Sequence, residues 1–583
     1  MPSEPHPNFV VYKARPVERT YYVASTSAIR AGHDRPVYFQ HFDGTRALEQ
    51  LAEALTQESK RNGGLPVTVT LKVHGYNTRR KHFEEEVLTD ADPTLRQRLF
   101  GKGKPPAGSD PAAEAFRSGS RFYIGFRWPS EGMLSRGSLK DSFTALVRTP
   151  MIGLYLILLP VLALLWLRSL EPFLSECVPW LAWLLAPMIA WGEGLWAAFR
   201  TGSPPVGEAL RVLLTPYQTV WIAATLFGCG LLLLLLRLST YPRDRYRALH
   251  YGVPDLGEFL RALEERLYPA NVKLDLDVIG HSMGTLVLIN AFRVMSDFFH
   301  APLTPDDGAI GRNGTYRLRT MVLCAPDLPA VMATPDRNNY FLSALRRFKA
   351  MHVFCSDRDI ILKWLSSLAN WISEPRHDMA GRRLGNVLLV RDRPSNLGRP
   401  DSRSDWELCP VTRPVMRHFH VYPHDPLISS GHPADLHFHD CSRAPSLAGA
   451  DMLQLGITLG LIAVLAWLSA CVCQGLFRWL LALAVVFLLV GCLCRFLWPW
   501  ARDRKNLRGM VGYFGDWPTI LMFLTAGMGW NPHSGYFMFH HPPRRRIAEI
   551  LRNPAALPPR DAQGKEIEEV DGAIRYRRVR VSV

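Results

Sequence analysis

The sequence predicts an α/β protein with a mostly parallel central sheet flanked by helices and interrupted by two membrane insertions. Three observations support this fold class. Short runs typical of strands alternate with helix-like segments along the chain. An alternating apolar run leads into Gly280-His-Ser-Met-Gly284, and an apolar helix-like run follows it. Long blocks nearly free of charge interrupt an otherwise polar and basic chain.

The elements follow in chain order from their periodicity. Residues 8–45 hold short β-rich runs that suit early antiparallel strands. Further strands are predicted at 67–73, 120–128, 274–279, 319–326, 351–356 and 415–422, the last of which should complete the sheet. Helices are predicted at 46–60, 78–88, 256–267 and 544–552, and a solvated strand or tail at 575–581.

The stretch Gly280-His-Ser-Met-Gly284 matches a nucleophile elbow, in which a strand, a sharp turn and a helix hold a serine above the end of a sheet. The turn is strained, and its two glycines let strand and helix approach closely because they lack a Cβ. The motif also occurs by chance, so an ordinary turn with an idle serine is the alternative. The flanking strand and helix favour Ser282 as the nucleophile.

The loop after strand 67–73 begins with His74-Gly-Tyr-Asn77. An acyl-transfer enzyme needs two backbone N–H donors aimed at the developing oxyanion. One normally comes from the residue after the nucleophile and the other from the loop after an earlier strand. We therefore expect the N–H groups of Tyr76 and Met283 to form an oxyanion hole. A plain Gly-Asn turn is the alternative at 75–77.

A serine hydroxyl is a weak nucleophile unless a histidine takes its proton and an acid orients that histidine. With a nucleophile elbow the chain order is Ser, then Asp or Glu, then His. The acid belongs in a loop after a late strand. Asp359 is the candidate there, and Asp357 and Asp327 are its rivals.

The candidate base is His533, which lies in a Gly/Pro/Asn-rich loop before a terminal helix. Its rivals are His540, His541 and a histidine-rich stretch. That stretch could instead hold a metal, but its loose spacing and lack of a carboxylate pattern favour a polar loop. We therefore predict no metal and no cofactor. The stretch contains His418, His420, His424, His432, His437 and His439.

The chain has 583 residues and a net charge of +16, from 68 Lys and Arg against 52 Asp and Glu. This excess favours anionic partners, either membrane lipid or nucleic acid. Because no nucleic-acid-binding signature is found, we expect no nucleic acid partner. The 10 scattered cysteines fit a reducing compartment, and no signal-peptide pattern begins the chain. The oligomeric state is left unknown.

Four membrane spans are predicted from the apolar blocks. In the first block, Thr149–Leu167 and Val212–Leu236 carry no charge and can each span roughly 30 Å of hydrocarbon. The shorter, Trp-rich segment 177–192 between them suits the lipid–water interface. In the second block, Met452–Phe477 and Trp479–Cys494 suggest a hairpin. Strands before and after the first block must pair in one sheet, so the number of crossings is even.

The charges next to these blocks predict their orientation. The flanks on the domain side are rich in Arg and Lys, and the far loop of the first block carries most of the nearby glutamates. The positive side is normally cytoplasmic, so the catalytic domain should be cytoplasmic. Both blocks should leave from carboxyl ends of strands, the edge that presents Ser282, so we expect the active site to face the bilayer. The basic tail 575–581 could also contact anionic lipid.

Five segments are predicted along the chain, divided by the two apolar blocks. They are 1–148, the first half of the catalytic domain; 149–240, the first membrane insertion; 241–449, the second half with the elbow; 450–501, the transmembrane hairpin; and 502–583, with the histidine loop, the last helix and the basic tail.

Several short motifs occur in an order that resembles an uncharacterised bacterial family of α/β-hydrolases, related to serine esterases and lipases. The resemblance covers roughly 20–148, 241–445 and 505–555, and the two apolar blocks depart from the pattern. It implies an α/β-hydrolase fold, serine-ester hydrolysis and the triad Ser282, Asp359 and His533. The motifs are His74-Gly-Tyr-Asn, Trp128-Pro-Ser, Tyr241-x-x-Asp-Arg, Gly280-His-Ser-Met-Gly-Thr, Ala325-Pro-Asp, Ser356-x-x-Asp359, Arg383-Leu-Gly and His533-Ser-x-Tyr.

The expected function is a serine hydrolase embedded in a bacterial inner membrane, which cleaves acyl esters of membrane lipids. One alternative is an anchored thioesterase or peptidase that acts on a non-lipid substrate. Another is a catalytically silent scaffold or transport-associated protein that keeps the hydrolase shape. Transport is disfavoured because the apolar blocks almost lack charged residues.

Overall fold

In a computed structural model of the chain, 11 of the described strands form one central sheet and two others form a small separate sheet. The structure describes the residues in the following ranges. These are 8–14, 19–26, 38–41, 44–76, 78, 80–91, 121–130, 241–300, 308–329, 343–344, 347–356, 359, 361–367, 369–370, 383–386, 388–391, 406–409, 433–442, 486, 489–490, 493, 532–537, 542–552, 569–570 and 574–582.

The central sheet has the order β12-β13-β11-β8-β7-β6-β4-β5-β2-β1-β3. The strands from β11 through β2 are parallel, and antiparallel strands extend the sheet at both edges. The strands are β1 (Phe9–Ala14), β2 (Thr20–Ser25), β3 (Phe39–His41), β4 (Val67–Val73), β5 (Phe122–Arg127), β6 (Leu274–His281), β7 (Tyr316–Cys324), β8 (Ala350–Cys355), β11 (Pro433–Asp440), β12 (Glu569–Val570) and β13 (Ile574–Ser582), and β9 (Leu388–Arg391) pairs with β10 (Trp406–Cys409) in the second sheet.

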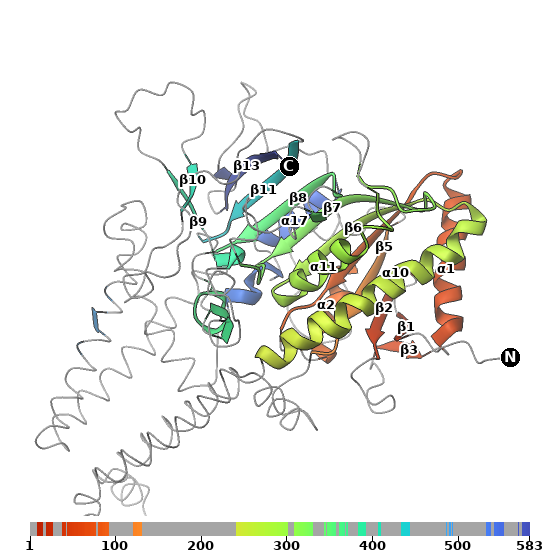
Figure 1. Cartoon of the computed structure of the whole chain (residues 1–583), viewed down its shortest axis with the longest axis horizontal. Helices are drawn as coiled ribbons and strands as arrows, with labels where there is room; N and C mark the ends of the chain where they lie inside the picture. Colours follow the sequence, from red (N-terminus) through yellow and green to blue (C-terminus); the bar gives the residue numbers. More distant parts are fainter. Residues whose placement is uncertain are drawn as a thin grey trace, which may run out of the picture.

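Helices cover both faces of the sheet (Figure 1). On one face α1, α10 and α11 pack over the first large core cluster. On the other face α2 packs on β5 and β2, and α17 packs over β6, β7 and β8. The helices are α1 (Gly44–Arg61), α2 (Arg80–Ala91), α10 (Val253–Leu267), α11 (Met283–Val294) and α17 (Pro542–Arg552), with short helical turns at Ala248–Gly252, Tyr268–Ala270, Ile361–Ser366, Leu384–Asn386 and Pro532–Phe537.

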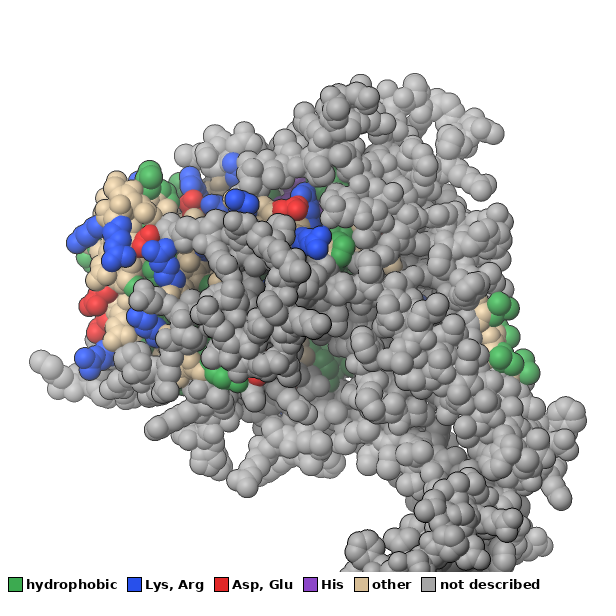
Figure 2. Space-filling model, turned by 180° about the vertical axis from the view of Figure 1, so that it is seen from behind, with side chains coloured by type: hydrophobic (Ala, Val, Ile, Leu, Met, Phe, Trp, Pro, Cys, Tyr) green, Lys and Arg blue, Asp and Glu red, His purple; other side chains and the backbone are tan. Residues whose placement is uncertain are grey.

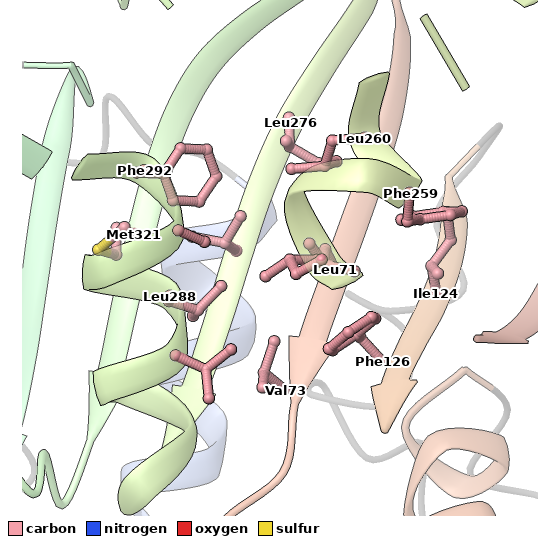
Figure 3. Close-up of a cluster of buried hydrophobic side chains, with 14 of the residues drawn as sticks. Leu71, Val73, Ile124, Phe126, Phe259, Leu260, Leu276, Leu288, Phe292 and Met321 are labelled. Carbon is pink, nitrogen blue, oxygen red and sulfur yellow. The ribbon is translucent and has the colours of Figure 1, made fainter. Parts of the chain in front are cut away.

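Apolar side chains of the central parallel strands form the main core (Figure 3). Leu71 of β4, Phe126 of β5 and Leu276 of β6 point toward α10 and α11, which contribute Leu260 and Leu288. Each of these side chains is at most 1% exposed. Continuous apolar strands are typical of parallel sheets buried on both faces, so this core fixes the central strands and the edge at which they end.

Most elements agree with the sequence expectations. The predicted strands at 67–73, 120–128, 274–279, 319–326 and 351–356 are confirmed as β4, β5, β6, β7 and β8, and the predicted helices as α1, α2, α10 and α17. The predicted strand 415–422 lies outside the described residues, and β11 follows it in sequence. The segment 575–581, expected as a solvated strand or tail, is confirmed as a strand, because β13 pairs along all of β11; the expected solvation is wrong for Tyr576, which is buried.

The parallel strands all end at one edge of the sheet, here called the carboxyl edge. The register aligns Val73 with Gly280, His281 with Cys324, and Asp440 with Cys355. Before each predicted insertion the described chain reaches this edge, at Ser130 after β5 and at Ser442 after β11. After the insertions it resumes at Tyr241 and Pro532, and both segments contact the carboxyl edge.

The predicted membrane spans lie outside the described residues, apart from isolated helical positions of the second block at 486, 489, 490 and 493. In the part of the chain that the structure describes, no helix is both long and apolar enough to cross a membrane. In Figure 2, Lys and Arg side chains are spread over the described part of the rear face and are interspersed with acidic ones. The positive charge therefore does not form a single patch on that visible surface.

Three histidines on β8 and β11 form a buried cluster on the face that carries α17. His352 and His437 are stacked with ring centroids 4.5 Å apart, and His352 Nδ1 lies 3.0 Å from His439 Nε2. Tyr576 of β13 is bonded to His437 Nδ1 at 2.6 Å. Burial, together with the neighbouring His437 and Arg546, holds the pKa of His352 and of His439 well below the usual value. Both rings are therefore neutral at pH 7.

Replacing Leu288 by Ala should lower the free energy of unfolding by about 2–5 kcal/mol, because it leaves a cavity in a fully buried site. Leu65, which is 66% exposed, is the matched control, and its Ala variant should change stability by less than about 0.5 kcal/mol. Denaturant unfolding of the purified proteins measures both values. Equal losses at the two sites would contradict the assignment of the core.

Acidification should destabilise the folded chain through the histidine cluster. Below about pH 6.5 the unfolded chain binds protons at His352 and His439 that the folded chain does not, so stability rises with pH. Each histidine should cost roughly 1.4 kcal/mol per pH unit below that value. Unfolding measured between pH 7.5 and 5.5 should show a shallower pH slope for His352→Gln than for the wild type. An unchanged slope would argue against neutral buried rings.

Candidate active site

Ser282 lies in a strained turn between β6 and α11. Its backbone angles are φ 52° and ψ −126°, a conformation that residues with a side chain rarely adopt. The Ser282 N–H donates to the carbonyl oxygen of Cys324 at 2.9 Å. The Ser282 carbonyl oxygen accepts from the Thr285 N–H at 3.0 Å and from Thr285 Oγ1 at 2.6 Å. The predicted succession of strand, turn and helix is confirmed, and these bonds hold the turn in its shape.

Gly280 and Gly284 allow this turn because strand and helix approach too closely for a Cβ. A Cβ on Gly284 would lie 2.3 Å from the carbonyl oxygen of His74, which is backbone and cannot move aside. A Cβ on Gly280 would lie 2.9 Å from Leu288 Cδ1 and 3.0 Å from Thr285 Cα. The steric role predicted for both glycines is thus confirmed.

The loop after β4 adjoins Ser282, the predicted nucleophile. A Cβ on Gly75 would lie 2.9 Å from the Cβ of Ser282, so the two backbones are in close contact. The Gly75 carbonyl oxygen accepts a hydrogen bond from Thr78 Oγ1 at 3.0 Å. The peptide bond between Gly75 and Tyr76 is trans, so the Tyr76 N–H points in the direction opposite to this carbonyl group. Met283 is the first residue of α11, where N–H groups lack an acceptor within the helix. Both expected oxyanion donors therefore belong to segments that adjoin Ser282.

Contacts between His74 and Trp128 fix the start of this loop, where β4 and β5 end. Their rings stack at 5.1 Å with an interplanar angle of 3°, and Trp128 Nε1 donates to the His74 carbonyl oxygen at 2.8 Å. Burial, reinforced by the nearby Arg127, lowers the pKa of His74 to about 3. A neutral, packed His74 gives the loop a rigid starting point.

Asp359 and His533 are brought together although 174 residues separate them. Asp359 Oδ2 lies 2.6 Å from His533 Nδ1, and both side chains are buried. The other carboxylate oxygen, Oδ1, accepts the N–H of Leu362 at 3.1 Å. The carbonyl oxygen of Asp359 accepts the N–H of Lys363 at 3.0 Å. The carboxylate is therefore fixed by the helical turn that follows it and is directed at the histidine.

His533 lies in the helical turn Pro532–Phe537, which packs against the elbow. The His533 carbonyl oxygen lies 2.8 Å from His281 Nε2, and the two rings are 4.9 Å apart at their centroids. Three residues later, Tyr536 is fully buried in the apolar cluster beneath α17. Because His281 precedes Ser282 directly, the turn that carries the candidate base His533 is packed next to the predicted nucleophile.

Asp327, a rival for the acid, contacts other partners. Its Oδ2 accepts from Tyr241 Oη at 2.7 Å, and its Oδ1 accepts from Ser366 Oγ at 2.5 Å and lies 3.3 Å from Arg383 Nε. The N–H of Asp327 donates to the Ser282 carbonyl oxygen at 3.3 Å, so Asp327 stabilises the elbow through its main chain. The remaining rivals, Asp357, His540, His541, His418, His420, His424 and His432, lie outside the described residues.

The sequence reasoning assigned no role to several motif residues that the structure connects. Tyr241 and Arg383 meet at Asp327, and the Tyr241 ring lies 5.5 Å from that of Tyr76. Ser130 Oγ donates to Asp244 Oδ2 at 2.7 Å, which ties the chain before the first insertion to the chain after it. Their presence in short polar motifs was the signal available in the sequence.

No group of three or more His, Cys, Asp or Glu side chains that could hold a metal is found in the described ranges. His437 and His439, two members of the histidine-rich stretch, are strand residues of β11 within the buried cluster. The other four members of that stretch lie outside these ranges.

Comparison with known proteins gives one family match. Residues 226–374 match the family model described as "Alpha/beta hydrolase of unknown function (DUF900)". This segment contains β6, the elbow, α11, β7, β8 and Asp359. No curated protein and no solved structure gives a significant match. The family match and the mostly parallel sheet together support an α/β-hydrolase family for this chain and suggest hydrolase activity.

Proposed function

We propose that this chain is a serine hydrolase that cleaves acyl esters of membrane lipids through Ser282, His533 and Asp359. The observation that carries the proposal is the buried contact of 2.6 Å between His533 Nδ1 and Asp359 Oδ2. It joins two distant segments beside a serine in a strained elbow. A carboxylate held on Nδ1 fixes the imidazole tautomer that has its lone pair on Nε2, as a general base requires.

The proposed reaction proceeds through an acyl-enzyme. Ser282 Oγ attacks the ester carbonyl carbon while His533 takes the hydroxyl proton at Nε2. The N–H groups of Tyr76 and Met283 stabilise the oxyanion of the tetrahedral intermediate. His533 then protonates the leaving alcohol, and the Ser282 ester remains. A water molecule, deprotonated by His533, hydrolyses this ester and releases the carboxylic acid.

Two observations favour a lipid substrate. The described chain leaves and re-enters the fold at the carboxyl edge on either side of both apolar blocks, which is also the edge of Ser282. In the second block, Val486, Leu489, Val490 and Leu493 are helical and exposed. Exposed apolar side chains of this kind suit contact with lipid. A bilayer at this edge would bring acyl esters to the serine, with the hydrolase domain on the cytoplasmic side of a bacterial inner membrane.

Labelling with a fluorophosphonate probe tests the chemistry. Wild-type protein in the membrane fraction should be labelled, and Ser282→Ala should give no labelling. The rate of labelling of His533→Ala should be lower than that of the wild type by roughly 10³-fold, because the base is missing. If wild-type protein is not labelled under any condition, the chain is a silent scaffold rather than a hydrolase.

Lipid profiling tests the substrate separately. Cells with Ser282→Ala should accumulate an acyl-ester lipid that wild-type cells convert to a free fatty acid. Purified wild-type protein should release fatty acid from vesicles of that lipid. If the serine is labelled but the lipids are unchanged, the chain is a hydrolase whose substrate is a thioester or a peptide rather than a membrane lipid.

Two matched carboxylate variants separate the triad acid from its rival. Asp359→Asn should lower kcat by about 10³–10⁴-fold with little loss of stability, because it disturbs the histidine tautomer. Asp327→Asn should mainly destabilise the protein, by about 3–5 kcal/mol, because it removes the carboxylate beside buried Arg383. Ester turnover and unfolding midpoints measure both effects. The reverse pattern would identify Asp327 as the acid.

A further inference from the structure

We propose that His281 is a positioning residue that sets the place of His533 relative to Ser282. The proposal rests on the proposed function, since it concerns the base of the same site. Its structural basis is a contact between a side chain and the main chain. The His281 Nε2 atom lies 2.8 Å from the carbonyl oxygen of His533, which is 252 residues away in the sequence.

The direction of this hydrogen bond is settled by its chemistry. A carbonyl oxygen can only accept, so His281 Nε2 carries the hydrogen and donates it. Three neighbours surround the ring. A Cβ on Gly75 would lie 2.9 Å from its Nδ1, the His533 ring is tilted against it at 4.9 Å, and the Phe537 ring is perpendicular to it at 5.3 Å between centroids. The imidazole therefore has one orientation, with its N–H toward the histidine turn.

The charge state of His281 suits this task. Burial, together with the neighbouring His533, holds the pKa of His281 well below its ordinary value, and nearby Lys72 and His74 act in the same direction. A neutral ring can donate a hydrogen bond without opposing the positive charge that His533 acquires when it takes the serine proton. A lysine or arginine donor at this position would oppose that charge.

The two contacts of His533 are complementary. Asp359 holds the side chain at Nδ1, and His281 holds the main chain at the carbonyl oxygen. The bond to Asp359 fixes only the imidazole, and the bond to His281 fixes the backbone that carries it. Because His281 is joined to Ser282 by a peptide bond, its contact relates the backbone of the base directly to that of the nucleophile. The base segment follows the second apolar block, so this bond completes the site across that interruption.

Three substitutions separate the donated hydrogen bond from mere packing. His281→Gln keeps an N–H donor at a similar reach, His281→Asn keeps a donor that is too short, and His281→Leu removes it. We expect His281→Asn and His281→Leu to lower kcat on a soluble p-nitrophenyl ester by about 10–100-fold, with KM changed by less than about threefold. His281→Gln should keep kcat within about threefold. Exposed His300 is the control, and His300→Leu should leave kcat unchanged.

The full-length protein in detergent is used throughout, and fluorophosphonate labelling rates should follow the same order as kcat. Wild-type kcat in His281→Leu would overturn the positioning role and leave the serine hydrolase intact. An equal loss in His281→Gln and His281→Leu would also overturn it. If His281→Leu fails to fold, the kcat of His281→Gln is compared with that of His281→Asn, and equal values for these two variants would overturn the positioning role. An unlabelled wild type would overturn the hydrolase and with it the role of His281.

Discussion

The strained backbone of Ser282 is the constraint on which the surrounding structure depends. A residue with a Cβ is held at φ 52° only because its neighbours allow no alternative. Gly284 lets α11 press against the carbonyl oxygen of His74, and the carbonyl oxygen of Cys324 accepts the serine N–H from the next strand. The turn thus uses β4, β6 and β7 together. The turn lies at the carboxyl edge of the parallel sheet, where these three strands end side by side.

The same edge joins segments that the apolar blocks separate in the sequence. Ser130 and Asp244 bond across the first block, and Asp359 and His533 bond across the second. Buried charges reinforce this arrangement on the face of α2 and α17. Lys72 of β4 lies 2.5 Å from Asp90 of α2, and Arg544 of α17 lies 3.1 Å from the same carboxylate. These ion pairs are costly to break once buried, so they fix the terminal helix and the histidine turn before it.

Sequence reasoning was most successful where chemistry and local geometry coincide. The elbow could be predicted because its glycines and its serine lie within five consecutive residues and serve one steric purpose. Asp359 was favoured over Asp327 by its place after a late strand and by the family resemblance, and the hydrogen-bond partners of Asp327 could not be foreseen. Tyr241 and Arg383 come from distant segments, and their meeting at one carboxylate depends on the fold. The burial of Tyr576 in the last strand was missed because the neighbouring arginines obscured the inward side of β13.

The sequence by itself determined the succession of strands and helices along the chain and the elbow at Ser282, because each depends on residues close together, and it predicted Ser282, Asp359 and His533 as candidates from their order in the chain. Tertiary structure decided which residues meet. It directed Asp359 toward His533, directed Asp327 toward Tyr241, and placed His281 against the histidine turn. The physical reason is that such contacts depend on strand order and register, which arise from packing of the whole sheet and leave no local trace in the chain.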